Sequence, residues 1–360
     1  MKINFILPFY PRFPIGGFKV QYEYANRLAE RGHQVAVIHS RSLAPATLIS
    51  DRIKGNIWRY LKPLLSGGIA PWFTFHSDVQ LRLLPDLRES FIPDADITVA
   101  TCWSVAEITQ HYSSRIGKQI YIVYDYEVWQ TASDDIRQRM SAVFQSNLAM
   151  VATSPAVKIM LQEHEATPVA YIPCGLDFDC YGLDVPISER VWGKIGFPAR
   201  DGIGKGLEDA IVTLKRLKVH YGDALEILAF GPKPVNIPDW VTFVCLPTDQ
   251  QLRAFYNQIS IFLFPSHYEG WGLPGIESLA CGSALVASDS IGLRDYAIDG
   301  KTALVVPIQR PDLLADSLEI LLQDDLLRQQ LAQNGYEHVQ QYTWQQSVNQ
   351  IELLFLETIK

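Results

Sequence analysis

Two carboxylates stand on either side of a glycine-rich turn in the second half of the chain. Glu269 and Glu277 are separated by seven residues. The apolar run 259–265 before them predicts a buried strand. Pro274 between them favours the first position of a helix, where its missing N–H leaves no bond unmade. A strand that passes through such a turn into a helix presents free backbone N–H groups, which form a ready binding site for an anion.

The two acids restrict the kind of anion that this turn can bind. A carboxylate beside an anion is unfavourable, because like charges repel, unless the carboxylate binds a neutral group such as a hydroxyl. The pattern therefore favours a phosphate flanked by sugar hydroxyls. The alternative is a plain strand–turn–helix whose acids lie on a solvated face.

Length and composition predict a two-domain α/β protein. The chain has 360 residues, 48% of them apolar, which exceeds one ordinary domain. A net charge of −8 and a pI near 5.5 argue against a nucleic-acid partner, which requires a basic face. Five cysteines without a C-x-x-C pair argue against a disulfide framework or a structural zinc. The first residues show no signal-peptide pattern and no apolar run reaches about 18 residues, so we expect a cytoplasmic protein.

The turn resembles a motif of a known family. Its sequence is similar to E-G-x-G-L-P-x-x-E, the common form of the E-x7-E motif in retaining glycosyltransferases of the glycogen-synthase-like family four. The matching residues are Glu269, Gly270, Gly272, Leu273, Pro274 and Glu277. The resemblance implies that Glu277 binds the ribose hydroxyls and Glu269 the sugar hydroxyls of a nucleotide sugar.

The resemblance also implies the fold and the domain boundaries. Members of this family have the GT-B fold, in which two Rossmann-like domains face each other across a cleft. The segment 172–177 resembles the hinge of the family, with Cys174 in place of the usual Asn. We therefore expect an acceptor-side domain over 1–168, a donor-side domain over 169–342, and a last helix, 343–360, that crosses back onto the first domain.

A glycine pair follows the first predicted strand. Gly16 and Gly17 lie where a helix is expected to begin, near residue 18. Alone, the pair is weak support for a site, and it lacks the G-x-G-x-x-G spacing of a nicotinamide dehydrogenase. The resemblance implies that the two glycines lie opposite the donor phosphates.

Two cations lie on the loop after the first strand of the second half, predicted over 191–197. The resemblance implies that Arg200 and Lys205 clamp the donor diphosphate, where fixed cations stabilise the charge of a leaving group. The alternative is a pair of solvated loop cations. We expect neither a metal nor a cofactor, because the clamp does that work. The segment Asp177–Asp179 has the D-x-D form of a metal site, but it lies at the hinge and is not assigned.

The predicted strand 119–124 ends in a segment that departs from the family pattern. Many members carry a histidine just after this strand, whereas here Tyr124 and Asp125 follow. The sequence Y-D-Y-E-V-W is more similar to the V-Q-D-Y-E form of rhamnosyltransferase-like relatives. Asp125 and Glu127 are therefore candidates for acceptor contact or proton handling. The alternative is capping of the strand end.

The segment 40–94 is the least informative part of the chain. Within it, the stretch 52–75 alternates basic and aromatic residues without an acid. One interpretation is a surface for an acceptor or for the inner face of a membrane, because basic and aromatic side chains together suit anionic head-groups. The other is a helix pair whose apolar residues enter the core.

The resemblance to family four, together with these features, implies a metal-independent retaining glycosyltransferase. It would move a hexosyl or deoxyhexosyl group from a nucleoside-diphosphate sugar to a hydroxyl of a glycan, lipid or small-molecule acceptor, as in polysaccharide biosynthesis. Similarity at residues 124–127 favours dTDP-rhamnose as donor, followed by UDP- or GDP-sugars. The alternatives are a GT-B nucleotide-sugar epimerase and a catalytically silent protein that binds sugar nucleotides.

Overall fold

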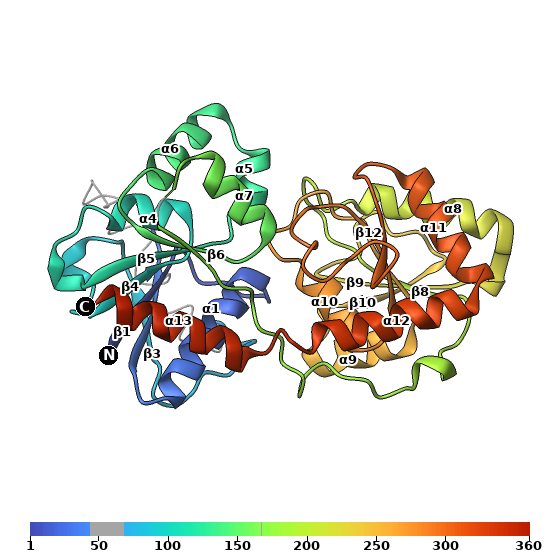
Figure 1. Cartoon of the computed structure of the whole chain (residues 1–360), viewed down its shortest axis with the longest axis horizontal. Coiled ribbons are helices and arrows are strands. Elements are labelled where there is room, and N and C mark those ends of the chain that lie inside the picture. The colour runs from blue at the N-terminus through green and yellow to red at the C-terminus, as the bar shows by residue number, and fades with distance from the viewer. Residues whose placement is uncertain (44–67, 167) are drawn as a thin grey trace. The chain divides into compact units, whose positions relative to one another are not determined.

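The computed structural model describes residues 1–43, 68–166 and 168–360 and divides them between two units (Figure 1). Unit 1 contains residues 1–153, 157–173 and 347–360, and unit 2 contains 154–156 and 174–346. Apart from the short piece 154–156, the chain passes between the units at 173/174 and 346/347, a few residues after the boundaries predicted at 168/169 and 342/343.

Unit 1 is built on a sheet of seven parallel strands. Their order is β3-β2-β1-β4-β5-β6-β7. The strands are β1 (Lys2–Leu7), β2 (Gln34–Ser40), β3 (Gln80–Leu84), β4 (Ile97–Ala100), β5 (Lys118–Val123), β6 (Ala149–Ala152) and β7 (Val169–Tyr171). The α-helices that follow them are α1 (Gly16–Glu30), α4 (Trp103–Thr109), α5 (Tyr126–Thr131), α6 (Asp134–Phe144) and α7 (Pro155–Glu163).

The aromatic residues of the stretch 52–75 that the structure describes pack inside unit 1. Residues 52–67 lie outside the described residues. The rings of Trp72, Phe73 and Phe75 lie 4.7 to 5.6 Å, centroid to centroid, from the ring of Tyr22 on α1. Tyr22 is fully buried. These contacts support packing of Trp72, Phe73 and Phe75 against the core, but residues 68–75 form bends, a turn and irregular chain and not a helix. A surface for an acceptor or a membrane stays a prediction.

The last helix returns to unit 1, as predicted. Helix α13 spans Trp344–Thr358, and from residue 347 it belongs to unit 1. Figure 1 shows it beside α1. Glu352 on α13 pairs with Arg31, and its other carboxylate oxygen lies 2.8 Å from Nε2 of His33. Buried Ile351 and Phe355 on the same helix supply its apolar contacts.

Unit 2 repeats the architecture with six parallel strands in the order β10-β9-β8-β11-β12-β13. The strands are β8 (Lys194–Pro198), β9 (Glu226–Gly231), β10 (Val241–Cys245), β11 (Ile261–Phe264), β12 (Ala284–Ser288) and β13 (Ala303–Val306). The α-helices are α8 (Leu207–Tyr221), α9 (Asp249–Gln258), α10 (Leu273–Ala280), α11 (Pro311–Gln323) and α12 (Asp325–Val339). The predicted pair of Rossmann-like sheets is therefore confirmed.

Both faces of the unit 2 sheet are covered, which explains its uninterrupted apolar strands. On β11, Ile261 and Leu263 face a core that includes Leu214 of α8 and Leu318 of α11. Phe262 points the other way, and its ring lies 5.3 Å from that of Tyr256 on α9. The first predicted strand of this unit is shorter than expected, because it begins at 194 and not at 191.

No helix within residues 1–43, 68–166 and 168–360 combines the length and the hydropathy that crossing a membrane requires.

A buried arginine holds together the backbone beneath β11 and α10. Arg190 is 6% exposed. Its guanidinium donates to the carbonyls of Tyr256 at 2.7 Å and Ile259 at 3.0 Å, and to that of Cys281. Burial lowers the pKa of Arg190 to about 10, so it remains charged at neutral pH. The donors of this one side chain therefore fix the end of α9, the start of β11 and the end of α10.

We expect Arg190→Met to lower the free energy of unfolding by about 3 kcal/mol, because it leaves several buried carbonyls without a donor. Urea unfolding measures this loss. Arg216→Met is the matched control, because Arg216 pairs with Asp316 at a half-exposed site on α8, and it should leave the unfolding midpoint nearly unchanged. Similar small losses for the two variants would contradict the anchoring role of Arg190.

Candidate functional site

The order of strands in unit 2 reverses direction between β8 and β11. From the centre of the sheet toward one edge the strands follow in the order β8, β9, β10, and toward the other edge in the order β11, β12, β13. In open parallel sheets, ligands bind beyond the carboxyl ends of the strands at such a switch point, because the two adjoining loops diverge there. The loop after β8 carries Arg200 and Lys205, and the loop after β11 carries Glu269.

The predicted cations and the first predicted acid meet at this switch point. Lys205 Nζ donates to Glu269 Oε1 over 3.2 Å, and Arg200 Nη2 lies 4.0 Å from the same oxygen. The Glu269 side chain is 9% exposed and that of Lys205 is 13% exposed. Arg200 Nη2 is buried, and it has no hydrogen-bond partner among the residues that the structure describes. A buried cation nitrogen thus remains available for an anion.

The second acid is held by a phenol. Glu277 on α10 is 6% exposed, and its Oε2 accepts a hydrogen bond of 3.0 Å from Tyr256 of α9. Burial and the charge of Glu277 raise the pKa of Tyr256 well above its ordinary value, so the phenol stays a donor. The two acids of the motif therefore have different partners, a cation for Glu269 and a neutral hydroxyl for Glu277.

A second buried tyrosine fixes the glycine turn. The Tyr296 hydroxyl donates to the carbonyl of Gly272 over 2.6 Å and to that of Trp271 over 3.1 Å. Burial, followed by the charges of Glu269, Glu277 and Asp295, raises the pKa of Tyr296 well above its ordinary value, so this phenol also stays a donor.

The remaining motif residues form the turn and the helix start that the sequence predicts. Gly272 caps α10 in the left-handed region, with φ of 74°. A Cβ at this position would lie 2.8 Å from the Tyr296 hydroxyl. Leu273 is the first residue of α10 and Pro274 the second, so the prediction of Pro274 at the first position is off by one. Gly270 lies in the turn beside Glu269.

Asp125 lies at the end of β5 in unit 1 and is almost completely buried. Its Oδ2 accepts a hydrogen bond of 2.8 Å from the backbone N–H of Trp103 and another from the Tyr121 hydroxyl. Burial raises the pKa of Asp125 to about 6, and these two hydrogen bonds oppose the rise. The contacts support the capping alternative for Asp125, because it joins the end of β5 to the start of α4.

The other predicted residues of unit 1 are more accessible. Glu127 lies in the first turn of α5 and is half-buried. Gly16 and Gly17 form the start of α1, whose first turn carries no acid. A Cβ on Gly17 would meet nothing within 4 Å, so the backbone there is open to a ligand.

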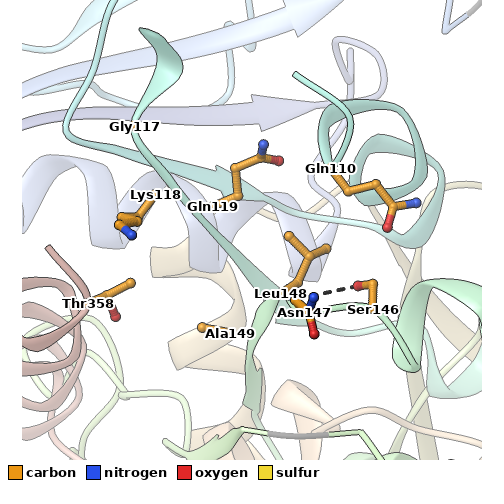
Figure 2. Close-up of a pocket in the computed structure, with 9 residues that line it drawn as sticks. All are labelled: Gln110, Gly117, Lys118, Gln119, Ser146, Asn147, Leu148, Ala149 and Thr358. Atoms are coloured by element: carbon orange, nitrogen blue, oxygen red, sulfur yellow. Dashed lines mark hydrogen bonds between the residues drawn. The ribbon is translucent and has the colours of Figure 1, made fainter. Parts of the chain in front are cut away.

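A cavity of about 560 Å³ lies elsewhere in unit 1, at the amino ends of β5 and β6. Figure 2 shows Lys118, Gln119 and Asn147 around it, with Thr358 of α13 at its side. None of the predicted site residues lines it. We place the candidate site at the switch point of unit 2, because the predicted charges converge there.

Within residues 1–43, 68–166 and 168–360, no group of three or more His, Cys, Asp or Glu side chains is arranged to hold a metal ion. Asp177 accepts hydrogen bonds from the backbone N–H groups of Asp179 and Cys180. The D-x-D segment therefore caps a turn.

Two tyrosines and one polar pair near the motif were not predicted from the sequence. Tyr256 bonds to Glu277, and Tyr296 bonds to the backbone of the glycine turn. His267 Nε2 lies 2.6 Å from Asp209 Oδ2, and this pair joins positions 58 residues apart. Only the position of His267, two residues before Glu269, could have pointed to it.

Comparisons with known proteins give a family match for part of the chain. Residues 233–338 match the family described as "Glycosyl transferases group 1". D-inositol 3-phosphate glycosyltransferase of Corynebacterium aurimucosum is 25% identical over 243 residues, which cover 59% of this chain and 58% of that protein. The chain thus spans less than two thirds of the length of this relative.

Two solved structures have a similar fold over nearly the whole chain. Sucrose-phosphate synthase of Thermosynechococcus elongatus has a TM-score of 0.76 and 18% identity, and covers 99% of this chain and 98% of its own. Anabaena HepE in complex with UDP and glucose has a TM-score of 0.73 and 15% identity, covering 99% and 100%. The chain has the GT-B fold, and its segment 233–338 matches the family model of the group 1 glycosyltransferases.

Proposed function

We propose that this protein is a retaining glycosyltransferase that moves a sugar from a nucleoside-diphosphate donor to an acceptor hydroxyl. The observation that carries the proposal is the meeting of Glu269, Lys205 and Arg200 at the switch point of unit 2. A leaving diphosphate gains negative charge as the glycosidic bond breaks. Fixed cations beside a helix N-terminus stabilise that charge without reorganisation.

Each acid has a role that fits its surroundings. Glu277 is buried and held by Tyr256, which suits a fixed acceptor for the ribose hydroxyls. Glu269 lies between two cations, and we assign it to the sugar hydroxyls and to the positive charge that develops at the anomeric carbon. Gly16 and Gly17 are assigned to the donor phosphates, and Gly270, Gly272, Leu273 and Pro274 to the backbone of the donor site.

Retention follows most simply from attack on one face of the sugar. The bond from the anomeric carbon to the diphosphate breaks, and the electron pair leaves with the phosphate oxygen. The acceptor oxygen then bonds to the same face and passes its proton to that phosphate oxygen. No metal takes part in this proposal, because Arg200 and Lys205 balance the charge.

The donor is proposed to carry a hexosyl or deoxyhexosyl group. Similarity of residues 124–127 to rhamnosyltransferase-like relatives favours dTDP-rhamnose, while the structure of HepE was solved with UDP and glucose. A glycan or a lipid-linked glycan is the proposed acceptor, with the first domain (1–168) on the acceptor side. A relative of this chain is described as a capsular polysaccharide biosynthesis glycosyltransferase, which supports a place in polysaccharide assembly.

One experiment distinguishes the proposed transferase from the two alternatives, an epimerase and a silent binding protein. A nucleotide-sugar epimerase converts its donor in buffer without an acceptor, and a silent binding protein converts no donor at all. Incubating UDP-, GDP- and dTDP-sugars with and without a glycan or lipid extract separates these functions. Transfer that requires the extract supports the proposal.

We expect Lys205→Ala to weaken the affinity for a nucleoside diphosphate roughly 10- to 100-fold, because a charge-assisted hydrogen bond to phosphate is lost. Isothermal titration calorimetry with UDP, GDP and dTDP measures this change. Lys215→Ala, an exposed change on helix α8, which begins two residues after Lys205, is the control and should bind like the wild type. Unchanged affinity for Lys205→Ala would remove Lys205 from the site.

Glu269→Gln should lower the turnover number by about 10²- to 10³-fold while changing nucleotide affinity little. The substitution keeps the shape of the side chain but removes its charge, and so it leaves Lys205 with one anion fewer. Glu277→Gln should instead act mainly on nucleotide affinity. Steady-state kinetics and calorimetry separate the two effects, and equal losses of turnover and affinity for Glu269→Gln would show that its role is misassigned.

The titration of Asp125 should appear in the stability of the protein. Its pKa is about 6 in the fold against an ordinary value of 3.8, so the folded protein binds this proton more tightly than the unfolded chain. The favourable contribution is therefore full below about pH 4 and is lost as the pH rises through 6. Compared with Asp125→Asn, the wild type should lose roughly 2 kcal/mol of unfolding free energy between pH 4 and pH 7. Urea unfolding at both pH values measures this, and parallel pH profiles would contradict it.

A further inference from the structure

Two loops of unit 2 carry the residues proposed to handle the donor. We call residues 202–206 the lysine loop and residues 265–269 the glutamate loop. They follow β8 and β11, which are hydrogen-bonded neighbours in the sheet. Lys205 and Glu269 meet across them, so the position of the lysine ammonium depends on how the two loops are joined.

The loops are joined closely through their backbones. Gly206, with φ of 67°, packs so tightly on the carbonyl of Pro265 that a Cβ at this position would collide with it. A Cβ on Gly204 would lie 2.6 Å from the ring of Tyr268. The backbone N–H of His267 donates to the Gly204 carbonyl over 2.7 Å. These contacts join the glutamate loop to Gly204 and Gly206, the two neighbours of Lys205 in the chain.

The imidazole ring of His267 makes a further contact, with the start of helix α8. Nε2 of His267 lies 2.6 Å from Oδ2 of Asp209, in the first turn of α8. The two side chains are only 14% and 17% exposed, so water competes for this hydrogen bond less than at a surface pair. One residue therefore holds Gly204 through its backbone and Asp209 through its side chain, and Lys205 lies between these two positions in the chain.

The hydrogen bond between His267 and Asp209 also affects how an acid at the start of α8 would interact with a bound phosphate. The first turn of α8 carries two acids, Glu208 and Asp209, at the end of the helix where a phosphate would be attracted by the dipole. An unpaired carboxylate there would repel the donor diphosphate. The hydrogen bond from His267 turns the Asp209 carboxylate toward the imidazole N–H, which stabilises the carboxylate in that orientation.

We propose that His267, bonded to Asp209, is a positioning residue that sets Lys205 for the donor diphosphate. The proposal rests on the function proposed above. His267 acts through Lys205 and touches no substrate itself. Its effect should therefore appear in nucleotide affinity, and it should disappear when Lys205 is absent.

The experiment measures the affinity for UDP, GDP and dTDP by calorimetry in the full chain. We expect His267→Ala and Asp209→Ala each to weaken binding about tenfold, and the double variant to be no weaker than either. His267→Gln retains an N–H donor for Asp209 and should stay within about threefold of the wild type. In the Lys205→Ala background, His267→Ala should cause no further loss. His220→Ala changes an exposed histidine at the other end of α8 and is the matched control.

The outcomes separate this inference from the proposed function. Wild type that binds none of the three nucleotides overturns both. Wild type that binds while His267→Ala binds equally well overturns the inference alone, as does a loss of the same size with and without Lys205, which would indicate a general structural role. If His267→Ala does not fold, Asp209→Ala in the two Lys205 backgrounds gives the same comparison. Rescue by His267→Gln together with a loss that requires Lys205 supports the proposal.

Discussion

The site in unit 2 depends on one constraint, which is that the carboxylate of Glu269 is nearly buried and must have a cation. Removing a charged group from water is strongly unfavourable unless an opposite charge and hydrogen bonds compensate. Lys205 supplies that compensation from the neighbouring loop, and Arg200 lies slightly further away. Because the pair joins the loops after β8 and β11, the acid and the lysine fix each other. A ligand phosphate that enters the site therefore meets cations whose positions are already set.

The fold supplies this pair by a simple topological route. Where two neighbouring parallel strands have connections that lead away in opposite directions, their loops leave a crevice at the carboxyl edge that side chains of both loops line. In unit 2 these strands are β8 and β11, and both glycines that permit the close approach, Gly204 and Gly206, lie on the first loop. Beneath the site, Arg190 fixes the backbone at both ends of the segment from β11 to α10. The segment that carries Glu269 and Glu277 is therefore held at both ends by buried hydrogen bonds.

The parts of this site that depend on neighbouring residues in the sequence could be predicted. The run from β11 to α10 combines apolar periodicity, a glycine turn and a proline near a helix start, so its structure and its acids were predicted together. Strand β3 was not predicted, because it is an edge strand with exposed Gln80 and Arg82 and lacks the apolar pattern of a buried strand. The partners of the acids could not be predicted either. Tyr256 and Tyr296 donate hydrogen bonds only because the fold brings them to the motif, and single-sequence patterns do not contain contacts between distant positions.

Under the proposed function, the different surroundings of the two acids suit one motif to two tasks. Glu277 accepts a hydrogen bond from a phenol that stays protonated near neutral pH. Glu269 is held by Lys205, whose ammonium group has more than one hydrogen-bond donor and can bind a phosphate oxygen while it keeps the carboxylate. In the proposed reaction, Lys205 would shift its interaction toward the negative charge of the departing diphosphate, which would leave Glu269 less compensated. A less compensated carboxylate would stabilise a positive anomeric carbon more strongly, so the proposal couples departure of the leaving group to stabilisation of the sugar through one lysine.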